Sequence, residues 1–472
     1  MLFNSFEFLV FFILSILTYT ITPKRFRWFQ LLVFSYGFYM WWNPTYILLI
    51  VVSTLIDFWC SYRMGQIAKE RRKPYLWLSV LSNLGILFTF KYFNFFSDAA
   101  QTIASALNIA YAKHTLELLL PMGISFYTFQ TMSFSIDVYN DKIKPEKHLG
   151  VFALYVSYFP QLVAGPIERA SHLLPQIRSF ENIQWKNISV GVKWIVLGLV
   201  KKVVIADRLA LFVDPVYNKP EMFGATTLFM ATVFFAFQIY CDFSGYSDIA
   251  IGVARFFNVR LMENFKMPYF STSISEFWKR WHISLSTWFR DYLYIPIGGN
   301  RVVKWRWYYN LMITFLVSGI WHGANWTFAV WGALHGIYLV LAIVFHQKGE
   351  IAQQSTIKFL LKNVWVFALV LLGWVFFRSN SVSDAIYILQ KLVSSKWVLG
   401  DIFTVFGQHN VYLLDVFLGL LGISFLLFFE AIYFFNWNKL KVISHPVFVS
   451  LGVVVIFLFG VFESKQFIYF QF

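Results

Sequence analysis

The chain has 472 residues, of which 58% are hydrophobic and 13% are charged, and its net charge is +15. The charged share is about half the roughly 25% of ordinary soluble domains, so polar side chains are too few to cover a water-soluble fold. The basic residues cluster in alternate loops, which argues against nucleic acid as a partner and indicates the topology of an integral membrane protein.

Apolar segments recur along the whole chain, and a helix that spans a bilayer uses roughly 20 such residues. We expect spans at Phe6–Tyr19, Phe29–Trp42, Tyr46–Cys60, Leu76–Phe93, Leu116–Val138, Val151–Val163, Val190–Ala206, Thr227–Tyr240, Leu311–Phe345, Phe359–Phe377, Val411–Phe434 and Val447–Phe462. They predict an all-α, polytopic membrane bundle of roughly eleven transmembrane helices. No fixed-period repeat or low-complexity linker divides them, so we expect one membrane domain over residues 1–472.

The charges of the first loops predict the orientation of the chain. The first loop carries Lys24, Arg25 and Arg27, the second (Trp42–Thr45) is uncharged, and the third (Arg63–Lys73) is basic again. Basic loops favour the cytoplasmic side, so the N-terminus should lie outside the cytoplasm. The first apolar segment lacks a basic n-region and a small-residue cleavage site, so we expect a retained helix rather than a signal peptide.

Polar residues interrupt the apolar chain at three places, where they usually face a bundle interior or a water-filled cavity. The first is Gln238–Asp248, with two carboxylates and two serines at the end of a span. These groups would either cap a helix end or line the mouth of a cavity, and the sequence leaves both open.

The second is Phe265–Arg301, which mixes aromatic and charged residues. Ser273 followed by Glu276 predicts a capped helix start, and Pro296 with the glycines after it predicts the stop. The helix between them is too charged to span alone, so we expect it to be interfacial or re-entrant. His282 lies within it, either as a functional group or as part of an interface anchor.

The third is Leu311–Phe345, which contains no Lys, Arg, Asp or Glu and is long for one crossing but short for two. Glycines on both sides of His322 predict a break, and backbone freed at depth must be buried in protein or line a cavity. His322 therefore lies at an intramembrane cavity, in a short surface loop, or in a helix–helix hydrogen bond. His335 is expected to be a packing or hydrogen-bonding residue.

Several catalytic signatures are absent from the sequence. It has no Walker loop, dinucleotide fingerprint, HExxH pair or GxSxG elbow, which removes support for an ATP-driven pump, a dehydrogenase and a serine hydrolase. Cys60 and Cys241 are the only cysteines, so we expect no disulfide framework and no cysteine metal site.

At these polar segments the chain resembles the membrane-bound O-acyltransferase family, in the bacterial branch that O-acetylates alginate and peptidoglycan. The resemblance is carried by LLPMGISFYTFQ (Leu119–Gln130), FPQLVAGPIER (Phe159–Arg169), FSGYSDIAIG (Phe243–Gly252), the Glu263–Arg301 stretch, GIWHGANW (Gly319–Trp326), GWVFFRS (Gly373–Ser379) and the terminal FIYFQF (Phe467–Phe472). It implies re-entrant helices around a tunnel open to both membrane faces.

The resemblance also implies the site. His322 matches the family's catalytic histidine and His282 the second histidine of this branch, while Asn300 matches its pattern. We expect substrate contacts from Trp281, Trp321, Asn300 and Asn325. No bound cofactor or metal is expected, and acetyl-CoA or another acyl thioester would be the donor substrate. An imidazole that is neutral near pH 7 can take a hydroxyl proton, so His322 would be the base or proton shuttle, and His282 would orient the donor or stabilise the oxyanion.

The expected function is O-acetylation of an extracytoplasmic cell-envelope polysaccharide, peptidoglycan or an alginate-like exopolysaccharide, from the bacterial cytoplasmic (inner) membrane. The expected partners are membrane lipid, the polysaccharide acceptor and a periplasmic acetyltransferase protein. Non-spanning stretches such as Asn94–Glu117 are far shorter than the roughly 50 residues of a small domain, so we expect the partner to hold the polymer. A transporter, a flippase or a scaffold without acyl chemistry is the alternative.

Overall fold

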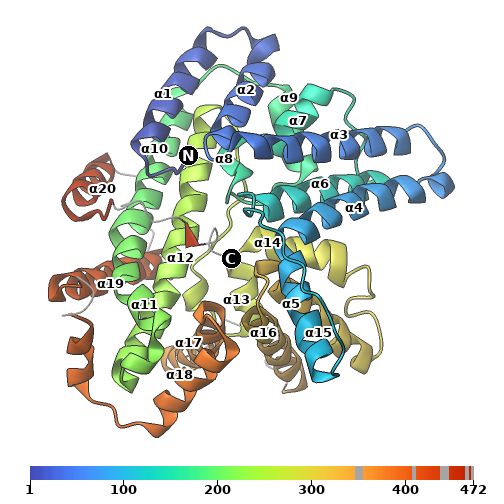
Figure 1. Ribbon diagram of the computed structural model, residues 1–472. Helices are drawn as coiled ribbons and strands as arrows, with labels where there is room; N and C mark the ends of the chain where they lie inside the picture. The colour runs from blue at the N-terminus through green and yellow to red at the C-terminus, as the bar shows by residue number, and fades with distance from the viewer. Residues whose placement is uncertain (346–354, 407–410, 436–445, 463–466, 469–472) are drawn as a thin grey trace. The chain divides into compact units, whose positions relative to one another are not determined.

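The computed structural model describes residues 1–345, 355–406, 411–435, 446–462 and 467–468, and every regular element among them is a helix (Figure 1). The predicted all-α class is therefore confirmed for this part of the chain. The chain forms two compact units: Met1–Val192 with Ala250–Met262, and Lys193–Ile249 with Glu263–Phe472. All six predicted site residues belong to the second unit.

Among the described residues, six helices are long and apolar enough to cross a membrane: Pro44–Met64, Lys69–Ala106, Ala225–Phe256, Trp326–Val344, Thr356–Arg378 and Leu413–Phe434. Phe6–Ile21 and Val449–Phe459 are shorter apolar helices. The chain is thus a multi-pass membrane protein. The prediction of roughly eleven crossings also counted shorter segments, such as Val151–Val163, which folds as two short helices with Pro160 near the start of the second.

The first unit holds the helices α1 (Phe6–Ile21), α2 (Arg27–Met40), α3 (Ile47–Met64), α4 (Lys73–Leu87), α5 (Phe93–Ala106), α6 (Ile124–Tyr139), α7 (Leu149–Ser157), α8 (Phe159–Leu162), α9 (Ala170–Arg178) and most of α10 (Trp185–Leu199). Buried polar side chains hold α3, α4 and α6 together. Asp57 accepts hydrogen bonds from Ser79 Oγ at 2.5 Å and Asn83 Nδ2 at 2.8 Å, and Thr131 Oγ1 donates to Asn83 Oδ1 at 3.1 Å. Each of these donors bonds to a buried acceptor. Such pairing is expected because polar groups inside a membrane are costly when they have no partner.

The second unit holds α11 (Asp207–Asn218), most of α12 (Ala225–Phe256), α13 (Ile274–Arg280), α14 (Ile283–Phe289), α15 (Lys304–His322), α16 (Trp326–Val344), α17 (Thr356–Arg378), α18 (Val382–Ser394), α19 (Leu413–Phe434) and α20 (Pro446–Phe459). Large aromatic side chains fill its core. Trp281, Trp331 and Trp374 are each 1% exposed. These rings surround the segments that carry His282 and His322.

The polar segment Gln238–Asp248 lies in the interior of α12 and not at its end, so the capping interpretation is wrong. Its two carboxylates are instead neutralised by lysines of the π-helix η5 (Val200–Ala206). Lys201 Nζ lies 2.7 Å from Asp248 Oδ2, and Lys202 Nζ lies 2.5 Å from Asp242 Oδ1. Buried charges are tolerated only when they are paired in this way.

Candidate active site

His322 is the last residue of α15, and the predicted break after it is confirmed. Gly323 is extended (φ −166°, ψ 155°), and Asn325 begins α16 by accepting a hydrogen bond from Thr327 N at 3.0 Å. A Cβ on Gly323 would lie 2.1 Å from the Phe328 ring, so a larger residue would push this ring away. The sequence GIWHGAN therefore ends one helix at the histidine and starts the next at the asparagine.

Two glycines bring α15 and α16 together one turn before His322, and the two helices lie side by side (Figure 1). A Cβ on Gly319 would lie 2.3 Å from the carbonyl oxygen of Phe328 and 3.1 Å from Cα of Gly332. Small residues allow this close approach of helix backbones in membranes. The approach fixes the end of α15, and with it His322, against α16.

The His322 side chain is enclosed by aromatic rings. The residue is only 4% exposed. Its ring centroid lies 5.0 Å from those of Trp321 and Trp331 and 5.3 Å from that of Phe377. This burial excludes the short surface loop as the position of His322.

The segment around His282 also contains a break, which the sequence did not predict. Ser273 caps α13 as expected, with its Oγ accepting from Glu276 N at 3.1 Å. The helix, however, ends at Arg280, and His282 takes a left-handed conformation (φ 42°, ψ 55°) before α14 begins. The single helix predicted between Ser273 and Pro296 is wrong. Left-handed backbone is costly for a residue with a side chain and is often found at functional sites.

Asn264 holds His282 in this conformation. Its Oδ1 accepts hydrogen bonds from the backbone N–H of Ser284 at 3.1 Å and from the Ser284 hydroxyl at 2.9 Å. The same oxygen lies 3.1 Å from Nδ1 of His282. Because an amide oxygen only accepts, this contact assigns the proton to Nδ1 and leaves Nε2 as the acceptor nitrogen.

The surroundings of His282 oppose a charge on its ring. The residue is 1% exposed, and burial lowers the pKa of His282 from 6.5 to about 3. Burial acts in this direction because a low-dielectric environment disfavours the charged form. His282 is therefore neutral at physiological pH.

Trp321 links the two histidines. Its ring centroid lies 6.4 Å from that of His282 and 5.0 Å from that of His322. Trp281, the other predicted tryptophan, packs against Trp374, at 5.0 Å between ring centroids. The structure thus places His282, Trp321 and His322 in one cluster, with Trp281 in the aromatic wall beside it.

The two predicted asparagines lie outside this cluster. Asn325 is used as the α16 cap, and its Nδ2 donates to the carbonyl oxygen of Asn380 at 2.9 Å. Asn300 is exposed in the turn after the π-helix η8 (Arg290–Tyr294). Its side chain makes no hydrogen bond within the described ranges. A substrate contact by either asparagine stays a prediction.

His335 has the structural role that the sequence predicted. Its Nδ1 accepts a hydrogen bond from Trp278 Nε1 at 3.3 Å, and the residue is 1% exposed. Across the part of the chain that the structure describes, no three His, Cys, Asp or Glu side chains gather as metal ligands.

Trp331 is a site residue that the sequence analysis missed. Its ring lies edge-on to His322, at 5.0 Å between centroids, and is 1% exposed. Its indole Nε1–H has no hydrogen-bond partner among the described residues. A buried donor without a partner is rare. The sequence gives no sign of this role, because Trp331 differs from the other tryptophans only in its position beside His322.

The end of the chain reaches the His282 side of the cluster. Ile468 N donates to Asp242 Oδ2 at 2.8 Å. The Phe243 ring lies between Phe467, at 5.5 Å, and His282, at 4.6 Å. The rest of the terminal FIYFQF segment, residues 469–472, lies outside the described residues.

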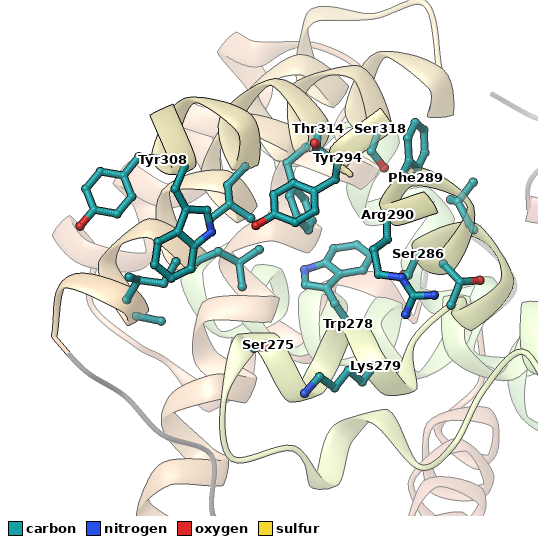
Figure 2. Close-up of a pocket in the computed structure, with 18 of the residues that line it drawn as sticks. Ser275, Trp278, Lys279, Ser286, Phe289, Arg290, Tyr294, Tyr308, Thr314 and Ser318 are labelled. Atoms are coloured by element: carbon teal, nitrogen blue, oxygen red, sulfur yellow. The ribbon is translucent and has the colours of Figure 1, made fainter. Parts of the chain in front are cut away.

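A pocket of about 1000 Å³ lies between α13, α14, η8, α15 and α16 (Figure 2). Its wall on α15 includes Leu311, Thr314, Phe315 and Ser318, which are spaced as one helix face. His322 follows Ser318 by four residues and so continues that face by one turn. The same face of α15 thus lines the pocket and carries the histidine.

Known proteins with similar sequences identify the family of the chain. Residues 75–382 match the sequence model of the MBOAT, membrane-bound O-acyltransferase family. The probable alginate O-acetylase AlgI of Azotobacter vinelandii is 39% identical over 406 residues, which cover 85% of this chain and 80% of the relative. The peptidoglycan O-acetyltransferase of Helicobacter pylori is 37% identical over 396 residues, 77% of this chain and 73% of the relative. The teichoic acid D-alanyltransferase of Streptococcus thermophilus is 30% identical over 304 residues, 60% of this chain and 71% of the relative. The chain belongs to the membrane-bound O-acyltransferase family.

Proposed function

We propose that the chain is an O-acetyltransferase of a bacterial inner membrane, and that it passes acetyl groups from a cytosolic thioester toward an extracytoplasmic polysaccharide. The observation that carries the proposal is the cluster of His282, Trp321 and His322, two buried histidines placed at two helix breaks. The names of the relatives support the acetyl group and the class of acceptor, an alginate-like polymer or peptidoglycan.

The chemistry requires one base and no bound cofactor. The acceptor oxygen forms a bond with the thioester carbonyl carbon while His322 takes the hydroxyl proton. The C–S bond then breaks, and the same proton passes from His322 to the leaving sulfur. The acetyl group thus moves from sulfur to oxygen and the proton moves from oxygen to sulfur, so the reaction consumes no other group. General-base help of this kind typically contributes about 10²–10⁴-fold in rate.

The geometry of His282 favours one of its two predicted roles. A neutral ring with its proton on Nδ1 presents Nε2 as an acceptor, so Nε2 can receive an N–H or O–H of a substrate and orient it. Stabilisation of an oxyanion would need a proton on Nε2, and burial opposes that second proton. We therefore assign to His282 the orientation of substrate and not the stabilisation of the oxyanion.

The indole N–H of Trp331 supplies the missing oxyanion donor in this proposal. It is buried, it has no hydrogen-bond partner among the described residues, and its ring packs edge-on to that of His322. A donor held in place before the reaction stabilises developing negative charge without reorganisation. In this arrangement the Trp321 ring lies between the two histidines and separates them.

The donor is acetyl-CoA or another cytosolic acyl thioester, and the N-terminus lies outside the cytoplasm. The proposed orientation rests on the basic third loop, where Arg72 and Lys69 pair with Asp141. Single cysteines at positions 71 and 44 test it with an impermeant thiol reagent in intact cells. Labelling at position 44 alone is expected, and labelling at position 71 alone would reverse the orientation.

Thioester consumption by purified protein tests the proposed chemistry. We expect wild-type protein in proteoliposomes to release thiol from acetyl-CoA when an acceptor is present, and His322→Ala to release none above background. His114→Ala is the matched control, because this histidine is exposed and far from the cluster in sequence. A transporter or flippase would move its substrate without cleaving a thioester, and a scaffold would do neither. Wild-type turnover by His322→Ala would contradict the assignment.

A further inference from the structure

Aromatic rings from three helices pack directly against the imidazole of His322. The ring centroids of Trp321 and Trp331 lie 5.0 Å from that of His322, with interplanar angles of 74° and 85°. The centroid of Phe377 lies 5.3 Å away, at 73°. Edge-on rings at such distances are in close contact. Little space is therefore left beside the imidazole, in agreement with the 4% exposure of His322.

The ring of Phe377 is held in place by its own neighbours. Its centroid lies 5.0 Å from that of Phe328, 5.3 Å from that of Trp374 and 5.4 Å from that of Trp331, and the residue is 1% exposed. Phe328 is confined in turn, because a Cβ on Gly323 would lie only 2.1 Å from its ring. Rings packed at this density resist the insertion of even one extra methylene group.

The proposed chemistry brings the acyl group of the donor among these rings. The acceptor oxygen must lie within hydrogen-bond reach of the base, at about 2.6–3.2 Å. The thioester carbonyl carbon must then lie about 3–3.5 Å from that oxygen. The carbon atoms beyond the carbonyl therefore begin within the layer of side chains that surrounds His322, and each further methylene must find room in it.

We infer that Phe377 restricts the donor to short acyl thioesters, so that the site accepts an acetyl group and rejects longer chains. The inference rests on the proposed function and names its specificity-determining residue. Trp331 also packs against His322, but its indole N–H has the proposed oxyanion role. Phe377 has no polar atom, and it closes the site from α17, whereas His322 belongs to α15 and Trp331 to α16. Its truncation therefore changes the available space without removing a hydrogen-bonding group.

The acyl-chain selectivity of variants tests the inference. Purified protein in proteoliposomes is given acetyl-, propionyl- or butyryl-coenzyme A with an acceptor present, and thiol release is measured for each thioester. The test variants are Phe377→Ala and Phe377→Leu. The matched control is Phe376→Ala, because Phe376 is the preceding residue of α17, is 8% exposed and makes no ring contact with His322 in the described part of the chain.

We expect wild-type protein to lose about 10–200-fold in kcat/KM with an added methylene group. In Phe377→Ala the ratio of butyryl to acetyl turnover should rise by about tenfold or more, because the cavity left by a truncated buried ring closes only in part. Phe377→Leu should give an intermediate ratio, and it tests the inference even where Phe377→Ala fails to accumulate. Phe376→Ala should keep the wild-type ratio.

The ratio does not depend on the amount of folded protein, so a purely structural role of Phe377 would leave it unchanged. A wild-type ratio in the Phe377 variants, or an equal rise in Phe376→Ala, would overturn the inference. A failure of wild-type protein to release thiol from any of the three thioesters would instead contradict the proposed function.

Discussion

Oδ1 of Asn264 lies 3.1 Å from Nδ1 of His282 while it also accepts two hydrogen bonds from Ser284. One amide oxygen thus fixes the tautomer of the histidine, its ring orientation and the start of the helix that follows. Asn264 is 1% exposed, so water does not compete for this oxygen. The residue acts through His282 and is a positioning residue.

Replacement of Asn264 by Asp should change the pH profile of the enzyme. A carboxylate beside Nδ1 favours the imidazolium and raises the pKa of His282, because an opposite charge stabilises the charged form. The low-pH limb of the activity should therefore move to higher pH, with activity recovering as the pH is raised. Initial rates between pH 5 and 9 check this. An unshifted limb in a folded Asn264→Asp protein would mean that Asn264 is only structural.

Stability should also depend on pH through His282. Its pKa is lowered from 6.5 to about 3 by burial, so below pH 6.5 the unfolded chain binds a proton that the folded protein does not. Stability should fall as pH decreases from 6.5, by about 1.4 kcal/mol per pH unit for this one group. Thermal unfolding of wild type and His282→Gln at pH 7 and pH 5 measures the difference. Parallel changes in both proteins would contradict the prediction.

Trp331→Phe should reduce turnover while the protein still accumulates. The change removes the indole N–H but keeps an aromatic ring against His322, and loss of one oxyanion donor typically costs about 10²–10³ in kcat. Trp374→Phe is the matched control, since this equally buried ring stacks on Trp331 at 6.3 Å. If both variants lose activity to the same extent, packing and not hydrogen bonding explains the effect.

The chain should need an extracytoplasmic partner to acetylate polymer. Its described segments outside the helices are short, and none forms a separate polysaccharide-binding domain. Proteoliposomes with acetyl-CoA inside and polymer outside should accumulate little acetylated polymer until a periplasmic transferase is added. Efficient polymer acetylation by this chain alone would show that transfer occurs directly at the outer end of the site.

The sequence by itself determined the membrane class, the all-helical fold and the break at His322. These follow from local rules: apolar segments of spanning length, and glycines that allow helices to end or to approach closely. It also identified His335 as a packing residue. Family resemblance added the functional reading of His282 and the acyl chemistry.

Only the tertiary structure decided how these parts meet. The break at His282 depends on Asn264, which is eighteen residues earlier in the chain, and local propensity predicted one continuous helix there. The carboxylates of Asp242 and Asp248 are neutralised by Lys202 and Lys201, which belong to another helix. Hydrogen bonds and ion pairs between distant segments leave no periodic signal, because their partners are set by packing in three dimensions and not by spacing along the chain.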